Sequence, residues 1–254
     1  MSLEITFISL FPGRIQYYLS HSLVGKAIAS EKLKVNFIQL RDFGLGAQNQ
    51  VDDYPYSKQS GMLLRVDVLS AAIRSIQGYS SAKIIYLDPK GQSLSQAWLK
   101  AESKMDQHLI LISGFYEGVD ARIFDLFDIQ RISIGDYVLS CGDLPALVLA
   151  ESLIRLLPGY VINKEPICND SFYDSGLEAN LYTRPALYEG LAVPDYLVSG
   201  HHAKIEDLNL QQAIKNTLLF KPKLLLQNLP NGDKLISADL LEEMSQSESN
   251  NTKH

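Results

Sequence analysis

Residues 112–120 read Ile-Ser-Gly-Phe-Tyr-Glu-Gly-Val-Asp, and residues 133–145 read Ser-Ile-Gly-Asp-Tyr-Val-Leu-Ser-Cys-Gly-Asp-Leu-Pro. In each stretch an apolar segment ends in a turn of small residues that also carries a tyrosine and a carboxylate. Glycine lets backbone N–H and C=O groups approach a ligand that a β-carbon would keep away. Tyr116 and Tyr137 add flat apolar surface, and the carboxylates add hydrogen-bond acceptors. A binding surface made of these aromatic rings and carboxylates suits a neutral or cationic heterocycle better than a negatively charged triphosphate.

Short apolar runs alternate with segments of helical spacing on both sides of these turns, which predicts βαβ units. The strands are expected at residues 4–10, 33–40, 83–88, 109–113 and 129–134. Helices are expected at 15–30 and 94–104. The pattern predicts an α/β fold with a mainly parallel sheet flanked by helices. A further helix at 143–157 is apolar on nearly all sides, so it should be buried or lie at a subunit interface.

The rest of the chain divides by composition. Residues 41–61 have no sustained period, and a loop this long in a compact domain is usually functional. We expect a main domain at 1–160, a flexible linker at 161–180 and a small helical domain at 181–244 with a helix near 203–219. The polar tail at 245–254 is expected to be disordered.

Composition narrows the function further. The 254 residues carry a net charge of -6, which argues against holding nucleic acid by bulk attraction but allows a local basic surface. No apolar run is long enough to span a bilayer, and no secretory signal is visible. With Cys141 and Cys168 as the only cysteines and no zinc-type spacing, we expect a reduced, cytoplasmic protein with no membrane partner and no metal ligands.

Many short motifs, in one unbroken order over about residues 4–225, resemble those of the bacterial tRNA (guanine-N1-)-methyltransferase family. These motifs are Ile8–Pro12, Arg41–Phe43, Val51–Asp53, Pro55–Tyr56, Gly61–Leu63, Leu87–Gly91, Gly114–Gly118, Ser133–Ser140, Leu144–Ala146, Arg155–Gly159, Asp170–Phe172, Tyr182–Pro185 and Ser199–Ala203. The resemblance implies a SPOUT-type methyltransferase domain with a C-terminal trefoil knot. Periodicity could not have indicated the knot, because un-knotted connections are the default.

The same resemblance implies the reaction and its partners. The enzyme would transfer a methyl group from S-adenosyl-L-methionine to N1 of the guanosine 3′ to the anticodon (position 37) of tRNA. It would act as a homodimer on the anticodon stem-loop. Mg²⁺ is expected to help, as it does in the family, although no cation site is readable in the sequence.

Two residues carry the implied catalysis. By resemblance, Asp170 is the general base that removes the weakly acidic N1 proton, and Arg155 stabilises negative charge on guanine O6. From the residues alone, Asp170 reads as a helix N-cap. Likewise, Arg155 reads as a cation that complements the C-terminal dipole of its helix. Both readings of Arg155 can hold together.

The implied binding residues fall in the motif loops. Those that resemble the cofactor loops are Leu87, Pro89, Gly91, Gly114, Tyr116, Glu117, Ile134, Gly135, Asp136, Tyr137, Val138, Leu139, Gly142 and Pro145. Without the resemblance they read equally well as ordinary strand-to-helix turns. Those that resemble the RNA-binding positions are Arg41, Asp52, Asp53, Tyr56, Gly61 and Arg184. The alternative for them is a solvated loop, although acidic side chains can accept from a guanine edge in a single-stranded loop.

The chain departs from the family pattern at several positions. Ser57–Ser60 replaces a glycine-rich run, Cys141 stands where the first glycine of a pair is usual, and Pro166 replaces a serine. The helix near 203–219 lacks the arginines common in relatives, which predicts weaker and less salt-sensitive RNA binding. Two alternatives therefore stay open: the same fold and cofactor with another RNA target, or a non-catalytic RNA- or cofactor-binding member. A Rossmann-type enzyme is disfavoured because no G-x-G-x-x-G follows the first strand.

Overall fold

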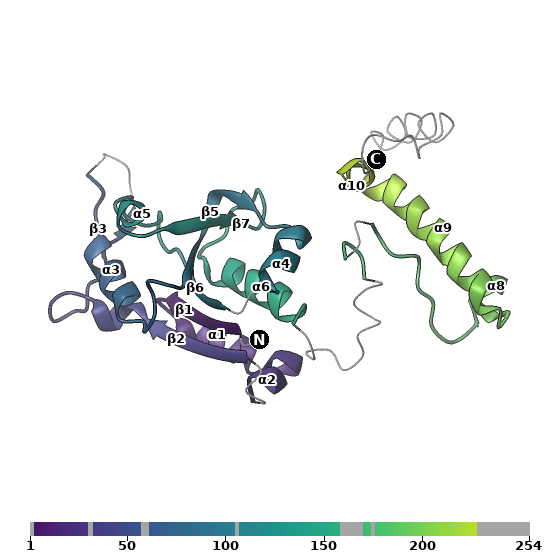
Figure 1. Cartoon of the computed structure of the whole chain (residues 1–254), viewed down its shortest axis with the longest axis horizontal. Helices are drawn as coiled ribbons and strands as arrows, with labels where there is room; N and C mark the ends of the chain where they lie inside the picture. The colour runs from purple at the N-terminus through teal and green to yellow at the C-terminus, as the bar shows by residue number, and fades with distance from the viewer. Residues whose placement is uncertain are drawn as a thin grey trace. The chain divides into compact units, whose positions relative to one another are not determined.

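The computed structural model describes residues 3–29, 33–56, 61–104, 107–157, 170–173 and 176–227. The chain falls into two units, with the boundary after residue 162. The first unit contains a five-stranded sheet in the order β2-β1-β6-β5-β7 (Figure 1). Its strands are β1 (Leu3–Ser9), β2 (Leu33–Gln39), β5 (Lys83–Ser93), β6 (Gln107–Ile112) and β7 (Ile129–Ser133).

Every pairing in this sheet is parallel, which confirms the predicted sheet. The strands β1 and β6 are buried along nearly their whole length. Near-continuous apolar runs of this kind are typical of parallel strands that are covered on both faces. One boundary differs from the expectation, because β5 continues past residue 88 to Ser93.

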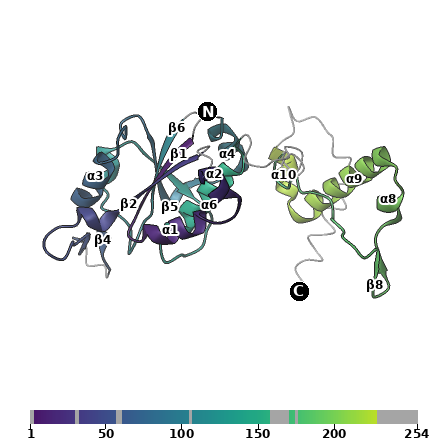
Figure 2. The same cartoon turned by 90° about the horizontal axis from the view of Figure 1, so that it is seen from below.

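Helices cover both faces of the sheet and create two hydrophobic cores (Figures 1 and 2). On one face lie α1 (Pro12–Leu19), α2 (Ser22–Ala29), α4 (Gln96–Glu102) and α6 (Asp143–Ile154). On the other face lie α3 (Val66–Arg74) and α5 (Ile123–Leu126). Alternate residues of β1 feed the two cores: Phe7 packs in the first and Ile8 in the second.

The single helix predicted at 15–30 is wrong, since the structure has two helices that are separated at Ser20 and His21. The Ser20 hydroxyl donates to the carbonyl of Tyr17, and this local bond competes with continued helix formation. Gly25 then packs against the Ser20 backbone, where a β-carbon would overlap the carbonyl oxygen. The break between α1 and α2 therefore depends on a serine hydrogen bond and a close backbone contact.

Two further elements differ from the sequence expectations. Helix α3 was missed, although its buried side chains Val68, Leu69, Ala72 and Ile73 have helical spacing. Helix α6 ends at Ile154, three residues before the predicted residue 157, and 3₁₀-type bonds continue the turn.

The segment 41–61 is more ordered than its composition suggested. A 3₁₀ turn, η1, covers Leu40–Phe43, and β3 (Asp52–Asp53) pairs antiparallel with β4 (Leu63–Leu64). The predicted departures at Ser57–Ser60 and Pro166 lie outside the described residues.

The second unit contains β8 (Leu187–Tyr188), β9 (Leu191–Ala192), α8 (Asp195–Val198), α9 (His202–Phe220) and α10 (Pro222–Gln227). Helix α9 confirms the helix expected at 203–219. Its buried residues Asn216 and Thr217 hold the preceding chain, because the Asn216 amide donates to the carbonyl of Glu178 at 2.8 Å. The Leu177 N–H also donates to the Thr217 hydroxyl at 2.8 Å. The expected linker 161–180 is described only in part, and the tail at 245–254 lies outside the described residues.

Candidate functional site

A cavity of about 410 Å³ lies where β5, β6 and β7 approach their carboxyl ends. Open parallel sheets commonly bind ligands at this edge. The walls of the cavity come from the β5 strand around residues 86–90, the turn after β6 and the long connection between β7 and α6. A cavity of this volume is within the range that holds a small organic ligand.

The first wall is a bulge inside β5 rather than a loop between elements. Leu87 and Gln92 both pair with Ile132, so the four residues between them bow out of the sheet. A β-carbon on Gly91 would overlap the backbone of Ile132, which explains the glycine at this position. Leu87 and Pro89 line the cavity, whereas Gly91 supports the bulge from behind.

The floor of the cavity is a close contact between two backbone segments. The Gly142 N–H donates to the carbonyl of Gly114 at 2.7 Å. A β-carbon on Gly142 would lie 2.5 Å from the Gly114 nitrogen and 2.9 Å from the Ser113 Cα. A β-carbon on Gly114 would lie 2.6 Å from the Tyr86 hydroxyl. The turn after β6 and the start of α6 therefore touch only because Gly142 has no side chain, while the absence of one on Gly114 leaves room for the Tyr86 hydroxyl.

A buried carboxylate supports this floor. The side chain of Asp143 opens α6, and its Oδ1 accepts a hydrogen bond of 2.7 Å from the Ser9 hydroxyl. The Ser9 hydroxyl in turn accepts from the Phe11 N–H at 2.9 Å. Within the described ranges, Asp143 Oδ2 and Ser113 Oγ are buried without a hydrogen-bond partner. The end of β1 and the first turn of α6 are thus joined under the cavity.

Tyr86 forms an aromatic side of the cavity. Its ring packs edge to face on Phe124, and the Arg131 guanidinium lies 3.6 Å from the Phe124 ring centre. Burial raises the pKa of Tyr86 to about 12, with a further contribution from the negative charge of Asp88. The phenol therefore stays protonated and can serve as a hydrogen-bond donor at any physiological pH.

Tyr116 connects the cavity wall to the segment that was predicted to meet RNA. Its backbone is left-handed, with φ at 56°, a conformation that costs a non-glycine residue roughly 1–3 kcal/mol. The pKa of the Tyr116 phenol is raised by burial and by Asp52, while Arg41 lowers it. The side chains of Arg41 and Asp52 both lie close enough to this phenol to act on its pKa. The strained turn thus aims one tyrosine at two residues from a separate part of the chain.

Most of the predicted cofactor residues gather around this cavity. Those that line it are Leu87, Pro89, Gly114, Tyr116, Glu117, Ile134, Gly135, Tyr137, Leu139, Gly142 and Pro145. Asp136 and Val138 do not line it, and Val138 is 98% exposed. Cys141 lies in the wall and also packs against the second core. The predicted pressure of its side chain on a bound ligand stays a prediction.

A family model described as tRNA (Guanine-1)-methyltransferase TrmD matches residues 3–227 of this chain. The chain belongs to this family. A protein from Endomicrobium trichonymphae named tRNA (guanine-N(1)-)-methyltransferase is 39% identical over 233 residues, covering 88% of this chain and 99% of the relative. Proteins of the same name are 37% identical in Staphylococcus carnosus (88% and 91% covered) and 38% identical in Rickettsia prowazekii (88% and 97% covered).

The other residues that resemble functional positions of the TrmD family lie apart from the cavity floor. Asp53 pairs with Arg65, and Tyr56 is fully exposed. Gly61 has φ at 109°, and a β-carbon there would overlap the Glu117 side chain. Arg184 belongs to the second unit.

The two predicted catalytic residues of this TrmD-family chain lie in different units. Arg155 follows α6 as its C-terminal cap in the first unit, and Asp170 belongs to the second unit. The helix-cap position of Arg155 agrees with the dipole reading of this residue, because cations are favoured at a helix C-terminus. The catalytic readings of both residues stay predictions.

Sequence reasoning missed several residues of the cavity wall. These are Tyr86, Asp88, Phe115, Val119, Phe124 and Arg131. Tyr86 immediately precedes the Leu87–Gly91 motif and is not part of it. Its place in the predicted strand was the only signal in the sequence that could have indicated it. Phe124 and Arg131 reach the cavity through packing across α5 and β7, which a linear motif does not encode.

The described residues of this TrmD-family chain were also compared with the requirements of a metal site and of a membrane-spanning helix. In the part of the chain that the structure describes, no group of three or more His, Cys, Asp or Glu side chains could hold a metal ion. Among the same residues, no helix combines the length and apolar character that crossing a membrane requires.

Proposed function

We propose that this protein transfers a methyl group from S-adenosyl-L-methionine to N1 of the guanosine 3′ to the anticodon of tRNA. The observation that carries the proposal is the continuous family match over residues 3–227, which spans both units. Relatives at 37–39% identity that bear the name tRNA (guanine-N(1)-)-methyltransferase support it.

The cavity fits the cofactor that this reaction needs. Its volume of about 410 Å³, its aromatic side at Tyr86 and its backbone floor at Gly114 and Gly142 suit a nucleoside with polar edges. A side chain on Gly142 would collide with the backbone of Ser113 and Gly114, and one on Gly114 would collide with the Tyr86 ring, so either change would distort the cavity. When bound, S-adenosyl-L-methionine supplies an electrophilic methyl group on a sulfonium. The cavity residues would orient the cofactor and exclude water from it.

Asp170 and Arg155 would act on the guanine. The Asp170 carboxylate would accept the N1 proton, since that nitrogen becomes nucleophilic only after it loses the proton. The Arg155 guanidinium would donate to O6, where the resulting negative charge concentrates. Both residues must reach one guanine for the reaction to proceed.

The remaining RNA contacts would come from Arg41, Asp52, Tyr56 and Gly61 of the first unit and from Arg184 of the second. Asp53 lies in the same segment but pairs with Arg65. Arg41 and Asp52 already meet the Tyr116 phenol at the cavity wall. We propose that this edge receives the anticodon stem-loop with the target base turned out of its stack.

The proposed function also implies a knotted fold and a homodimer. The family fold would pass the chain between β7 and α6 through a C-terminal trefoil knot of the SPOUT type. Leu144 and Val148 of α6 are 57% and 44% exposed and lie four residues apart, on one side of the helix. These two side chains would offer an apolar surface to a second copy of the chain, and Tyr137 and Val138 are further exposed apolar side chains in the segment before α6. We propose a cytoplasmic homodimer in which Mg²⁺ assists the reaction.

The test compares two tRNA transcripts that differ only at position 37, one with guanosine and one with adenosine. Methyl groups from labelled cofactor should enter only the guanosine transcript. The Asp170→Asn variant should lose this activity while it keeps nearly unchanged cofactor affinity by calorimetry, because the base acts on RNA alone. Equal labelling of both transcripts would point to another RNA target. Cofactor binding without transfer to any RNA would point to a non-catalytic protein.

A further inference from the structure

Three segments at the edge of the first unit are joined by backbone hydrogen bonds. The Arg65 N–H donates to the carbonyl of Val51 at 2.9 Å. The Leu64 N–H donates to Gly118 at 2.9 Å, and the Asp120 N–H donates to Leu64 at 3.0 Å. The β3 strand, the β4 strand and the turn that lines the cavity therefore form a continuous surface.

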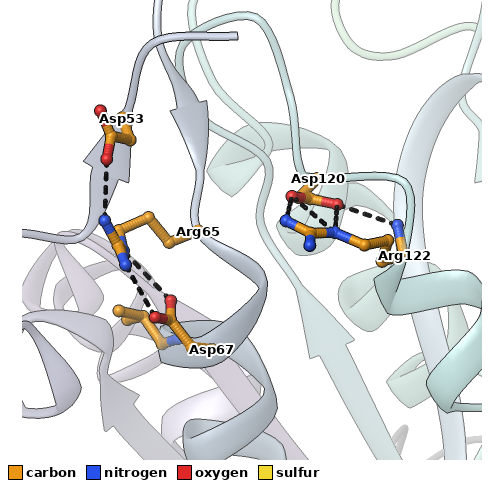
Figure 3. A network of polar contacts seen from close by, with 6 residues as sticks. Asp53, Arg65, Asp67, Asp120 and Arg122 are labelled. Atoms are coloured by element: carbon orange, nitrogen blue, oxygen red, sulfur yellow. Dashed lines mark hydrogen bonds and ion pairs between the residues drawn. The ribbon is translucent and has the colours of Figure 1, made fainter. Parts of the chain in front are cut away.

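Arg65 adds a side-chain link across this surface (Figure 3). Its Nη1 donates to Asp53 Oδ2 at 2.8 Å. Its Nε and Nη2 donate to the two oxygens of Asp67 at 3.1 and 2.8 Å, a bidentate geometry that lysine cannot reproduce. This pairing lowers the pKa of Asp67, so both partners stay charged at neutral pH.

One end of this link is rigid. Asp67 lies in the first turn of α3 and accepts the Val68 N–H, and α3 buries Val68, Leu69, Ala72 and Ile73 in the second core. The other end is a strand of two residues. Arg65 thus ties a minimal strand to a helix that the core holds in place.

The two aspartates of β3 have different partners. Asp53 uses both carboxylate oxygens inside the protein, since Oδ2 accepts from Arg65 and Oδ1 accepts from the Tyr54 N–H at 2.8 Å. Asp52 instead pairs with Leu64, whose N–H donates to the carbonyl of Gly118 in the cavity wall. The charge of Asp52 also acts on the Tyr116 phenol in the same wall. Neighbouring side chains in a strand point to opposite faces, so fixing Asp53 also fixes the direction of Asp52.

We propose that Arg65 is a positioning residue for the RNA substrate: by holding Asp53, it keeps Asp52 at the cavity wall, where Asp52 meets the target base. This inference rests on the proposed function, and it assigns Asp53 a structural role rather than contact with RNA. Arg65 itself does not touch the substrate.

Arg122 provides a matched control. It makes a bidentate pair with Asp120 two residues away, on the same surface (Figure 3). That pair lies within three consecutive residues before α5, and its hydrogen bonds do not involve β3. Its loss should leave the direction of Asp52 unchanged.

The first test needs no substrate. Hydrogen exchange of the free protein is measured for wild type, Arg65→Gln, Arg65→Lys and Arg122→Gln. Exposed ion pairs have modest strength, so Arg65→Gln should speed amide exchange in residues 51–54 by about two- to fivefold. The exchange rate of Arg65→Lys should lie between those of wild type and Arg65→Gln, and Arg122→Gln should match wild type in that segment. Unchanged exchange in Arg65→Gln would overturn the positioning role, whatever the protein's activity proves to be.

The second test uses methyl transfer to unmodified tRNA. Arg65→Gln and Asp53→Asn should each raise the tRNA KM about two- to fivefold with little change in kcat or in cofactor KM. The double variant should be no worse than either single variant, because both remove one link. A lower kcat with unchanged tRNA KM, or additive effects of the two changes, would contradict the inference. No transfer by wild type would contradict the proposed function and leave the exchange test to decide on Arg65.

Discussion

The Gly142→Ala variant tests the backbone contact under the cavity. Gly142 has an ordinary helical φ of -79°, so alanine is disfavoured there by space and not by backbone conformation. Its new β-carbon would lie 2.5 Å from the Gly114 nitrogen and 2.9 Å from the Ser113 Cα, and backbone atoms cannot turn aside as a flexible side chain can.

The magnitude follows from two losses. Overpacking a tight site costs about 1–3 kcal/mol. Separation of the two segments also weakens the 2.7 Å hydrogen bond from Gly142 to Gly114, which contributes about 1 kcal/mol. We therefore expect the free energy of unfolding to fall by roughly 2–4 kcal/mol. Because the same contact forms the cavity floor, affinity for S-adenosyl-L-methionine should fall at least about tenfold.

Gly13→Ala is the matched control, because nothing lies within 4 Å of its new β-carbon and Gly13 is inside α1. That variant should gain up to about 1 kcal/mol, since alanine is the better helix former. Urea unfolding and calorimetric titration with the cofactor measure both quantities for each variant. A Gly142→Ala protein with the stability and cofactor affinity of wild type would refute the close contact.

Two further predictions concern buried polar groups. Ser9→Ala should lower the free energy of unfolding by about 1–3 kcal/mol in urea titrations, because it leaves the buried Asp143 carboxylate without its hydrogen bond; an unchanged midpoint would refute that role. Folding raises the pKa of Tyr86 from 10.0 to about 12. Between these values the unfolded chain has released the phenol proton while the folded chain keeps it, so the free energy of unfolding falls as the pH rises. The contribution of Tyr86 to stability is therefore complete below pH 10 and is lost as the pH approaches 12. Between those limits wild type should lose roughly 2–3 kcal/mol more than Tyr86→Phe, and parallel losses in both proteins would contradict the burial of this phenol.

The sheet was predictable because its strands encode burial on both faces. The expected strands correspond to β1, β2, β5, β6 and β7, and the apolar helix near 143 corresponds to α6. Continuous apolar runs and helical spacing are local properties, so a single sequence contains them. The break between α1 and α2 was not visible, because it depends on the contact of Gly25 with the Ser20 backbone.

The candidate site was predictable only where it consists of glycine turns. Gly114 and Gly142 were identified from the sequence, and the structure brings them into contact. The support beneath them was not predictable, because Ser9 and Asp143 are 134 positions apart and no pattern relates them. The role of Arg65 was likewise not predictable, because its link between Asp53 of β3 and Asp67 of α3 exists only in the folded chain.

The loop expected at 41–61 illustrates the intermediate case. Its turn formers correctly indicated an irregular segment, yet Asp52 and Asp53 form a strand because β4 lies opposite them. A pairing this short has no periodicity to detect. Its stability comes from Arg65 and from the backbone bonds to the turn after β6, which are tertiary contacts.

Nucleoside mass spectrometry of unmodified tRNA, incubated with the protein and S-adenosyl-L-methionine, decides whether this protein methylates guanine N1. We expect 1-methylguanosine at the position 3′ to the anticodon, formed only when protein and cofactor are both present. An unmodified digest, or a methyl group on any other nucleoside, would contradict it.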